Sequence, residues 1–180
     1  MNTATLGKFA AGVEDALVAL EDARAEGVLP QAKFEAACMV VLVKAKATGV
    51  QLADLALSAE LTRLYKRLVP PLGLSLPADA QDTARQALRD TLDSPQYAVN
   101  ATAAMAVLGR SETLSAAQEA TSDALIVQKV EGWTRDLNDG ACELCRDLAG
   151  EVLPAKARMW HHKGCGCSQR PVTTTQEETA

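Results

Sequence analysis

The chain has 180 residues, of which 48% are hydrophobic and 23% charged, with a formal net charge of −5 and a pI near 5.1. These proportions are typical of globular proteins and exclude a wholly disordered chain. The acidic balance excludes a protein that coats nucleic acid with its whole surface, and leaves a local basic patch open. Aromatic residues make up only 3%, so a core of Leu, Val and Ala in packed helices is favoured over a sheet.

Targeting and membrane signals are the next class to consider. The N-terminal segment lacks the pattern of a secretion signal, because Glu14 and Asp15 interrupt its apolar residues early. Apolar runs such as residues 39–43 are far shorter than the ~20 residues that cross a bilayer. We therefore expect a soluble protein made in a reducing cytosol, without a membrane partner. In such a compartment, clustered cysteines are more often metal ligands or redox groups than disulfides.

Residues 1–69 are expected to form an N-terminal helical region. The first helix is predicted by apolar residues at the three-and-four spacing of one helical face, namely Leu6, Phe9, Val13, Leu17 and Leu20. A second helix is predicted to begin at Pro30 and to stop at Gly49, and a third to span 52–68. Cys38 falls on the inward face of the second helix. It is interpreted as a small buried hydrophobe rather than a reactive thiol or a further ligand.

The Pro-rich residues 70–78 are predicted to be a linker, because prolines cannot occupy a helix interior. A second helical region, 79–132, follows. Its helices are expected over 79–93 and 95–108, where Ser94 can cap and Pro95 can take the first turn. Gly109 is predicted to end the second of these. Ser111 is then predicted to cap a long helix that continues to Trp133.

Residues 133–172 form the most informative segment, because they hold four of the five cysteines and both histidines. The helical period fades after Trp133 and turn residues take over, which predicts a small module of hairpins and turns. The last residues, 173–180, are polar and are expected to form a flexible tail. The predicted fold class is therefore mostly α, with a multi-helix body and a small metal-stabilised C-terminal module.

The spacing of the cysteines and histidines is typical of a metal site. Cys142 and Cys145 are separated by two residues, as are His162 and Cys165, with Cys167 two residues further. Sixteen residues lie between the two pairs, which is within the range of structural zinc modules. Glycines flank Cys165 and supply the backbone freedom of a tight turn. The candidate ligands of the hypothesised structural zinc ion are Cys142, Cys145, His162, Cys165 and Cys167.

The choice among these ligands stays open on spacing alone. Cys142 and Cys145 are the firmest, and His162 with one of the two later cysteines completes four. All four cysteines could bind instead, which would make the histidines spectators. His161 is expected to be a supporting or surface residue, because adjacent side chains rarely point at one ion. A cluster of free thiols, or a disulfide from Cys142 to a later cysteine, is the remaining alternative.

Size gives an independent reason to expect a metal. A module of about 35 residues cannot build a sufficient core from side chains alone. Metal binding, worth roughly 10–16 kcal/mol in small zinc peptides, would supply the missing stability. Trp133, Leu148 and Val152 are expected to pack the module onto the last long helix. A closed set of four ligands leaves no position for a substrate, so the site is interpreted as structural.

Catalytic interpretations find little support in the sequence. A His-Asn-His nuclease needs more histidines and a downstream Asn, and the chain has only two histidines. The Cys-x2-Cys pair has the spacing of a thiol-disulfide exchange site but no βαβ pattern around it. No Gly-rich phosphate loop and no Ser-His-Asp set can be found. We therefore expect a protein that is not an enzyme.

The charge balance reverses around the cluster. Over 146–172, five basic residues stand against Asp147 and Glu151, namely Arg146, Lys156, Arg158, Lys163 and Arg170. Contact of these residues with DNA phosphates is one hypothesis. Support of the metal site and solubility is the simpler interpretation.

Three segments together resemble the C-terminal portion of the phage Mu F-like minor head proteins, also called head morphogenesis proteins. They are "GRSET" at 109–113, "VEGWTRDLNDGACELCRDLAGEV" from Val130, and "HHKGCGCSQRPV" from His161. The family's pattern falls on Arg110, Glu112, Trp133, Asp136 or Asp139, Cys142, Cys145, Leu148, Gly150, His162, Cys165, Cys167 and Pro171. The chain departs from it at Lys163, where Pro is usual, at Gly166, where Arg is usual, and in the extra His161.

The resemblance covers about 109–172 and implies a virion component. Such a protein would be made in the bacterial host cytoplasm and incorporated inside the phage head. The implied partners are the portal protein and, further, the major capsid or scaffold protein and packaged DNA. The implied role is in head morphogenesis at the portal, in DNA packaging or in ejection. The alternatives are a zinc-ribbon-like adaptor that binds DNA or protein, and a nuclease of the His-Asn-His type.

Overall fold

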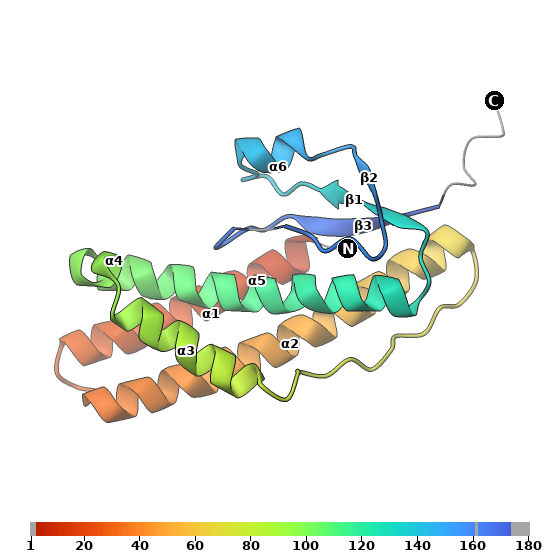
Figure 1. The fold of residues 1–180 in the computed structure, drawn as a ribbon. Helices are drawn as coiled ribbons and strands as arrows, with labels where there is room; N and C mark the ends of the chain where they lie inside the picture. The colour runs from red at the N-terminus through yellow and green to blue at the C-terminus, as the bar shows by residue number, and fades with distance from the viewer. Residues whose placement is uncertain (1–2, 161, 174–180) are drawn as a thin grey trace.

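The computed structural model describes residues 3–160 and 162–173, in which a layer of helices carries a small sheet (Figure 1). The expected tail beyond residue 173 and the predicted supporting residue His161 lie outside the described residues. The described elements, in chain order, are α1 (Thr3–Ala25), α2 (Gln31–Tyr65), α3 (Ala80–Leu92), α4 (Pro95–Val99), α5 (Ala101–Val127), β1 (Gly132–Asp136), α6 (Glu143–Asp147), β2 (Val152–Pro154) and β3 (Ser168–Val172). This architecture confirms the predicted mostly α fold with a small C-terminal module.

The three long helices α1, α2 and α5 form the body of the molecule. Each packs against the other two, and α3 and α4 cover one end of the bundle (Figure 1). Two apolar clusters fill the space between them, one around Leu17, Phe34 and Met105, the other around Val50 and Leu114. Cys38 is fully buried in the first cluster, as its position on the inward face predicted. The Leu and Ala residues at helical spacing therefore form one apolar stripe on each helix, and these stripes face the core of the bundle.

Gly49 does not end the second helix, so the predicted stop there was wrong. Helix α2 runs without interruption from Gln31 to Tyr65. A Cβ at Gly49 would lie 2.9 Å from the carbonyl oxygen of Thr113 on α5. The glycine is therefore needed for the close approach of two helices rather than for a turn. A glycine that ends a helix and a glycine at a close helix contact look the same in the sequence, and only the position of the partner helix distinguishes the two roles.

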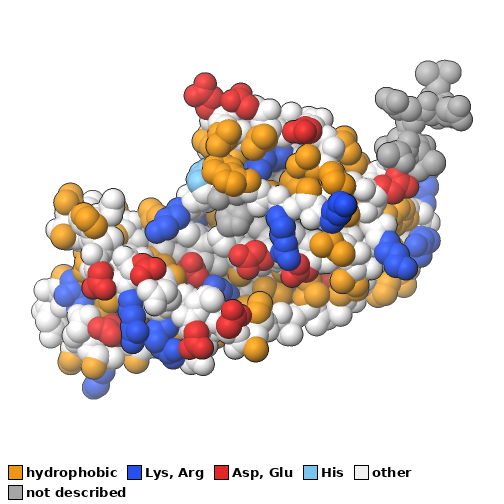
Figure 2. Space-filling view, in the orientation of Figure 1, with side chains coloured by type: hydrophobic (Ala, Val, Ile, Leu, Met, Phe, Trp, Pro, Cys, Tyr) orange, Lys and Arg blue, Asp and Glu red, His pale blue; other side chains and the backbone are white. Residues whose placement is uncertain are grey.

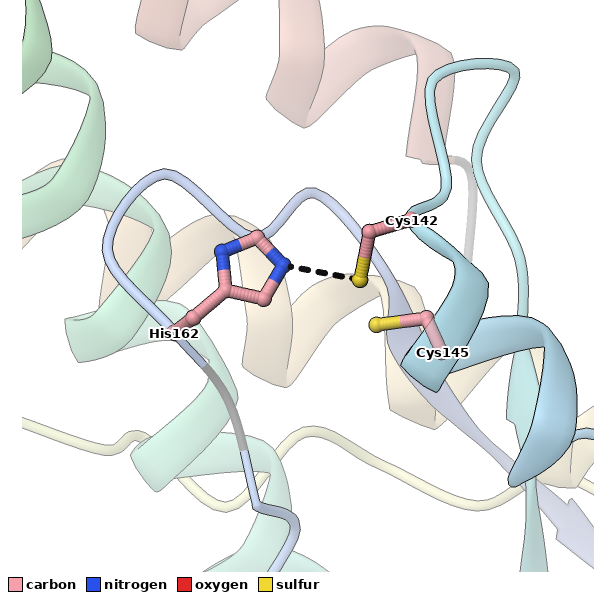
Figure 3. A group of neighbouring side chains, drawn as sticks. All are labelled: Cys142, Cys145 and His162. Atoms are coloured by element: carbon pink, nitrogen blue, oxygen red, sulfur yellow. Dashed lines mark hydrogen bonds between the residues drawn. The ribbon is translucent and has the colours of Figure 1, made fainter.

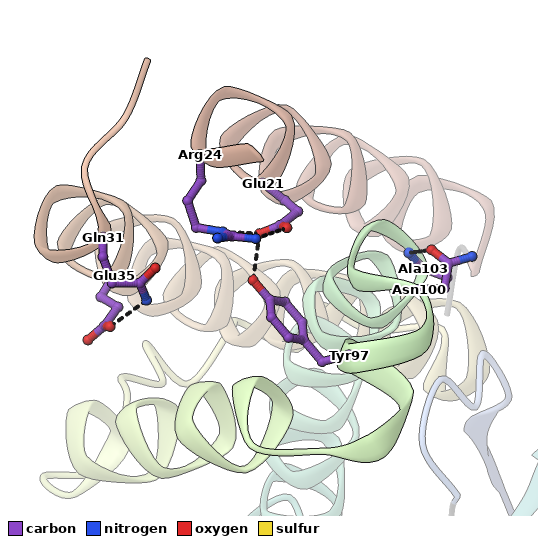
Figure 4. Close-up of polar contacts among 7 residues, drawn as sticks. All are labelled: Glu21, Arg24, Gln31, Glu35, Tyr97, Asn100 and Ala103. Atoms are coloured by element: carbon purple, nitrogen blue, oxygen red, sulfur yellow. Dashed lines mark hydrogen bonds and ion pairs between the residues drawn. The ribbon is translucent and has the colours of Figure 1, made fainter. Parts of the chain in front are cut away.

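The predicted boundaries at Gly109 and Ser111 were also wrong. Helix α4 is only five residues long, and Ser94 caps it as expected by accepting a hydrogen bond from the Tyr97 backbone. The long helix begins instead after Asn100, whose side chain accepts from the Ala103 N–H (Figure 4). Gly109 lies inside α5, where a Cβ would be 3.2 Å from the α1 backbone. Both glycines thus mark helix contacts, and α5 ends at Val127, before Trp133.

Residues 66–79 connect α2 to α3 without regular structure and are anchored along α2. The buried carboxylate of Asp54 accepts hydrogen bonds from the backbone N–H groups of Leu72, Gly73 and Leu74, at 2.7–3.1 Å. Ser58 donates to the carbonyl of Val69. The predicted linker therefore has the expected irregular backbone, but it is held against one helix rather than separating two domains.

A polar cluster fixes α1 to α4 at the far end of the bundle. The carboxylate of Glu21, which is almost fully buried, receives hydrogen bonds from Arg24 and from the Tyr97 hydroxyl (Figure 4). The hydrogen bonds from Arg24 hold the pKa of Glu21 below its ordinary value, and burial opposes that shift. Burial and the neighbouring Glu21 carboxylate raise the pKa of Tyr97 to about 12. Glu21 is therefore a buried charge that is fully paired.

The C-terminal module contains a three-stranded antiparallel sheet with the order β2-β1-β3. Trp133 is the second residue of β1, which is the central strand, and it lies opposite Leu153 on one side and Pro171 on the other. Its ring is buried, with 1% exposed, and its indole N–H donates to the carbonyl of Ala157. The expectation that Trp133 packs the module is confirmed. Val152 was wrongly included, because its side chain is 59% exposed.

The module rests on α5 and α2, and one apolar cluster runs from the body into it (Figure 1). Leu57 and Leu61 of α2 and Leu125 of α5 share this cluster with Trp133 and three of the cysteines. By length and composition α2 is also apolar enough to cross a membrane, a property that core helices of helical bundles share. Here its apolar side faces α1, α3 and α5. The body and the module therefore have a continuous interior.

Candidate metal centre

Two short segments place the predicted ligands. Cys142 precedes the first turn of α6 and Cys145 lies within it, so one helical turn puts both thiols on the same side. The second segment is the turn 162–167, which the Cys165 N–H closes onto the carbonyl of His162. Gly164 in this turn has a φ of +74°, a conformation that glycine adopts at little cost. At Gly166 the backbone lies close to a side chain, and a Cβ there would meet the Asn138 amide at 2.8 Å, so that the amide would have to move.

Two of the distances between donor atoms are close to those in a tetrahedral metal site. The Cys142 sulfur is 3.3 Å from Nε2 of His162, and the imidazole points at it (Figure 3). The Cys145 sulfur is 3.7 Å from that of Cys165. Ligands of a tetrahedral zinc ion stand about 3.8 Å apart for two sulfurs and about 3.6 Å apart for sulfur and nitrogen. The arrangement therefore fits a metal ion held by sulfur and imidazole donors.

Two overlapping groups of three donors can be formed among the residues that the structure describes. One comprises Cys142, Cys145 and His162, and the other Cys145, Cys165 and Cys167, each with all donor atoms within 4.8 Å of one another. Cys145 belongs to both groups and is the central sulfur. All five candidate ligands are thus brought together, and this Cys/His cluster could hold a metal ion. Which four of them would bind is not fixed by these distances.

Exposure differs between the two sides of the cluster. Cys145, Cys165 and Cys167 are buried, Cys142 is half-buried and His162 is exposed. The backbone N–H of Cys145 is the main cause of a lowered pKa for the Cys142 thiol, with smaller contributions from the Cys145 and His162 side chains. Burial raises the pKa of the Cys145 thiol, and the neighbouring cysteines add to that shift. A bound cation would reverse this shift, because it stabilises the thiolate directly.

Cys38 plays no part in the cluster. It lies in the core of the helical body beside Leu42, and burial raises its pKa to about 12. A thiol that is buried and hard to ionise is chemically inert. The structure therefore separates one packing cysteine from four clustered ones.

Helix α5 supports the ligand turn through three polar side chains, of which Gln118 and Ser122 were not predicted and Arg110 was singled out by the resemblance alone. Gln118 donates to the carbonyls of both Cys165 and Cys167 at 2.8 Å, and Arg110 donates to that of Gly164. Ser122 donates to Oε1 of Gln169, just beyond the turn. These three residues recur at multiples of four on an otherwise Ala-rich helix, which places them on one face. That spacing was the signal from which they could have been found.

Basic residues around the module do not form a continuous surface on the face shown in Figure 2. Lys and Arg side chains there alternate with Asp and Glu, and Arg158 is paired with Asp123 at 2.8 Å. Hydrophobic side chains gather on the module above α5 (Figure 2). Leu144 and Trp160 are among the large apolar residues exposed in the module, Trp160 at 51%. This surface is therefore mixed rather than strongly basic.

Comparison with known proteins assigns no family. No protein-family model matches the chain, and no curated protein and no solved structure is significantly similar to it. The residues of the cluster and their surroundings are therefore the features of the chain that bear on its function.

Proposed function

We propose that this chain is a non-enzymatic minor head protein of a phage, of the Mu F-like class, in which a structural zinc ion holds the C-terminal module together. One observation carries the proposal most directly. Arg110, from the first segment of the resemblance, donates to Gly164 in the last segment, 54 positions away in the chain. The segments that define the resemblance thus meet at one place, around the candidate metal centre.

Zinc is the metal that the donor chemistry favours. Thiolate and imidazole ligands in a tetrahedral arrangement are typical of structural zinc, whereas Mg²⁺ and Ca²⁺ prefer oxygen ligands. Cys142, Cys145, His162, Cys165 and Cys167 supply the possible ligands, four of which would close the coordination sphere. The ion would contribute stability rather than a Lewis acid for a substrate. Its role in the proposal is to fix the module on α5.

The exposed apolar side chains support a protein partner. Val99 on α4 is 88% exposed, and Leu144 and Trp160 are exposed on the module. Apolar and aromatic residues are favoured at protein interfaces, whereas DNA-binding surfaces are strongly positive. We therefore propose the portal as the principal partner, with the major capsid or scaffold protein as further partners. The proposed location is the inside of the phage head, after synthesis in the host cytoplasm.

The zinc part of the proposal is tested by metal content. Elemental mass spectrometry on untagged protein should give one zinc per chain, and thiol titration should show protected thiols that become reactive after chelation. The variant Cys145→Ala should lose the metal, because both donor groups use this sulfur. The matched control Cys38→Ala should keep it. A wild-type chain free of metal, with four freely reactive thiols, would refute the zinc centre.

The virion part is tested on purified particles. Mass spectrometry of nuclease-treated, gradient-purified phage heads should detect peptides of this chain, with a host cytosolic protein as the negative control. Absence of the chain from intact heads would contradict the proposal. Salt-sensitive binding to duplex DNA by the full chain would then favour the adaptor. Metal-dependent DNA cleavage that is lost in His162→Ala would favour the nuclease.

A further inference from the structure

Arg135 on β1 is a buried cation beside the metal centre. Its side chain is only 5% exposed and approaches Cys145, with 3.5 Å between Nη1 and the sulfur. Its other terminal nitrogen, Nη2, donates to the carbonyl of Trp160 at 2.6 Å. Among the ion pairs of residues 3–160 and 162–173, none involves Arg135. The guanidinium therefore has hydrogen-bond partners but no carboxylate to balance its charge.

A buried guanidinium without a counter-charge is strongly unfavourable. Neutral thiols would not balance it. A zinc ion with three thiolates and one imidazole has a net charge of −1, and one with four thiolates a net charge of −2. Either centre would be an anion within hydrogen-bond distance of Arg135. Among the described residues, Arg135 is the buried cation that lacks a carboxylate, and it lies beside the thiols that would become negative when a metal binds.

We propose that Arg135 is the counter-charge and the positioning residue of the metal–thiolate centre. The inference rests on the proposed zinc site and adds to it a residue that is not a ligand. Arg135 would balance the negative charge of the thiolates and donate a hydrogen bond to the central sulfur, Cys145.

The geometry also explains why an arginine is suited to this position. One terminal nitrogen reaches Cys145 on α6, and the other reaches Trp160, two residues before His162. The planar guanidinium thereby connects the two segments that carry the ligands. Lysine has the same charge but cannot hold two partners in a fixed plane. Substitution by lysine, which keeps the charge, and by methionine, which removes it, can therefore separate the effect of the charge of Arg135 from the effect of its orientation.

The test compares Arg135→Met and Arg135→Lys with the control Arg146→Met. Arg146 is exposed on α6 beside Cys145, so its substitution makes the same change in net charge outside the interior. Zinc affinity is measured by competition with a chromophoric chelator on the full chain. Substitution of a residue that hydrogen-bonds a metal ligand typically lowers metal affinity about 10–100-fold. We expect a loss of that order for Arg135→Met, a smaller loss for Arg135→Lys, and less than about twofold for Arg146→Met.

A spectroscopic measurement distinguishes charge balance from a merely structural role. At saturating Co²⁺, the sulfur-to-cobalt charge-transfer band should move to longer wavelength in Arg135→Met, because the thiolates lose a positive neighbour that stabilises their electrons. The band of Arg135→Lys should stay close to that of the wild type. An unshifted band in folded Arg135→Met would overturn the inference, as would an affinity equal to that of Arg146→Met.

Failure of the inference and failure of the zinc site can be told apart. A wild-type chain that binds neither Zn²⁺ nor Co²⁺ refutes the centre itself, and the role of Arg135 with it. If the wild type binds zinc and the Arg135 variants have the same zinc affinity and the same cobalt band, only the role of Arg135 is refuted. If Arg135→Met does not fold, Arg135→Lys decides, because loss of the wild-type band in this charge-conserving variant would overturn the charge argument.

Discussion

The helical body and the C-terminal module are built in opposite ways. In the body, three long helices enclose apolar clusters of Leu, Ala, Val and Phe, and its buried charge at Glu21 is paired. In the module, the apolar part of the interior consists of one tryptophan, one methionine, a few small residues and sulfur atoms, and the charged Arg135 is buried beside them. A sheet of three short strands cannot bury enough area to be stable alone. The body thus depends on packing between its own helices, whereas the module packs against α5 and α2 and carries a Cys/His cluster that could hold a metal ion.

The two regions nevertheless share an interior. Leu57 and Leu61 of α2 contact the same cluster as Trp133, and Gln118 of α5 binds the ligand turn. A change in composition near residue 133 therefore marks a change in the means of stabilisation, but not a break in packing. The predictions below test how far the two regions can be separated.

The largest expected effect is that of removing the metal. Both tryptophans of the chain, Trp133 and Trp160, belong to the module, so tryptophan fluorescence reports the module, whereas far-UV circular dichroism reports mainly the helical body. Chelation should remove roughly 10–16 kcal/mol of binding free energy from the module. We expect the fluorescence to shift to longer wavelength while most of the helical signal remains. Equal loss of both signals would show that the two regions unfold as one unit.

Truncation of the central tryptophan should have the next largest effect. Trp133→Ala should cost about 3–5 kcal/mol, because it empties the middle of the shared cluster. Trp160→Ala is the matched control and should change stability by less than about 0.5 kcal/mol, since its side chain is half exposed. Chemical denaturation followed by circular dichroism measures both. Similar costs for the two variants would contradict the role assigned to Trp133.

A glycine substitution tests the packing of the body. Gly49→Ala should cost about 1–3 kcal/mol, because the added methyl group would meet the backbone of α5 at 2.9 Å. Gly12→Ala is the control on the exposed side of α1, where nothing lies within 4 Å. It should stabilise the protein by about 0.5–1 kcal/mol. Thermal unfolding distinguishes these opposite signs, and a stabilising Gly49→Ala would contradict the close contact.

The smallest predicted effect concerns the paired charge at Glu21. Its pKa is lowered in the folded state, so its contribution is present above the unfolded value of about 4.3 and is lost as the pH falls through the folded value. Glu21→Gln should therefore destabilise the protein at pH 7, by about 1 kcal/mol, and much less at pH 2. Glu35→Gln, in the exposed contact with Gln31 (Figure 4), should show little effect at either pH. Melting temperatures at the two pH values measure this difference.

Local patterns predicted the parts of the structure that local forces determine. The apolar stripe of α1, the cap at Ser94 and the irregular backbone after Val69 all follow from neighbouring residues. The convergence of the five candidate ligands followed from their spacing, while zinc itself stays a prediction. Gly49 and Gly109 were misread because a helix end and a close helix contact select the same residue. The role of Arg135 could not be recognised from its neighbours, since its partners lie 10 and 25 positions away. The partners of Gln118 lie 47 and 49 positions away, and the spacing of polar residues along α5 is its local signal.

Arg110 gives the two ends of the chain a common contact. Its guanidinium pairs with Glu14 of α1 at 3.0 Å and also donates to Gly164 in the ligand turn. The first helix and the ligand turn are therefore joined through a single side chain, which makes both contacts at once. Because coupling free energies are reciprocal, an ion that ordered the ligand turn would favour the pairing of Arg110 with Glu14, and loss of that pairing would weaken ion binding by the same factor. A substitution at Glu14 in the first helix is thus expected to alter ion binding at the ligand turn near the end of the chain.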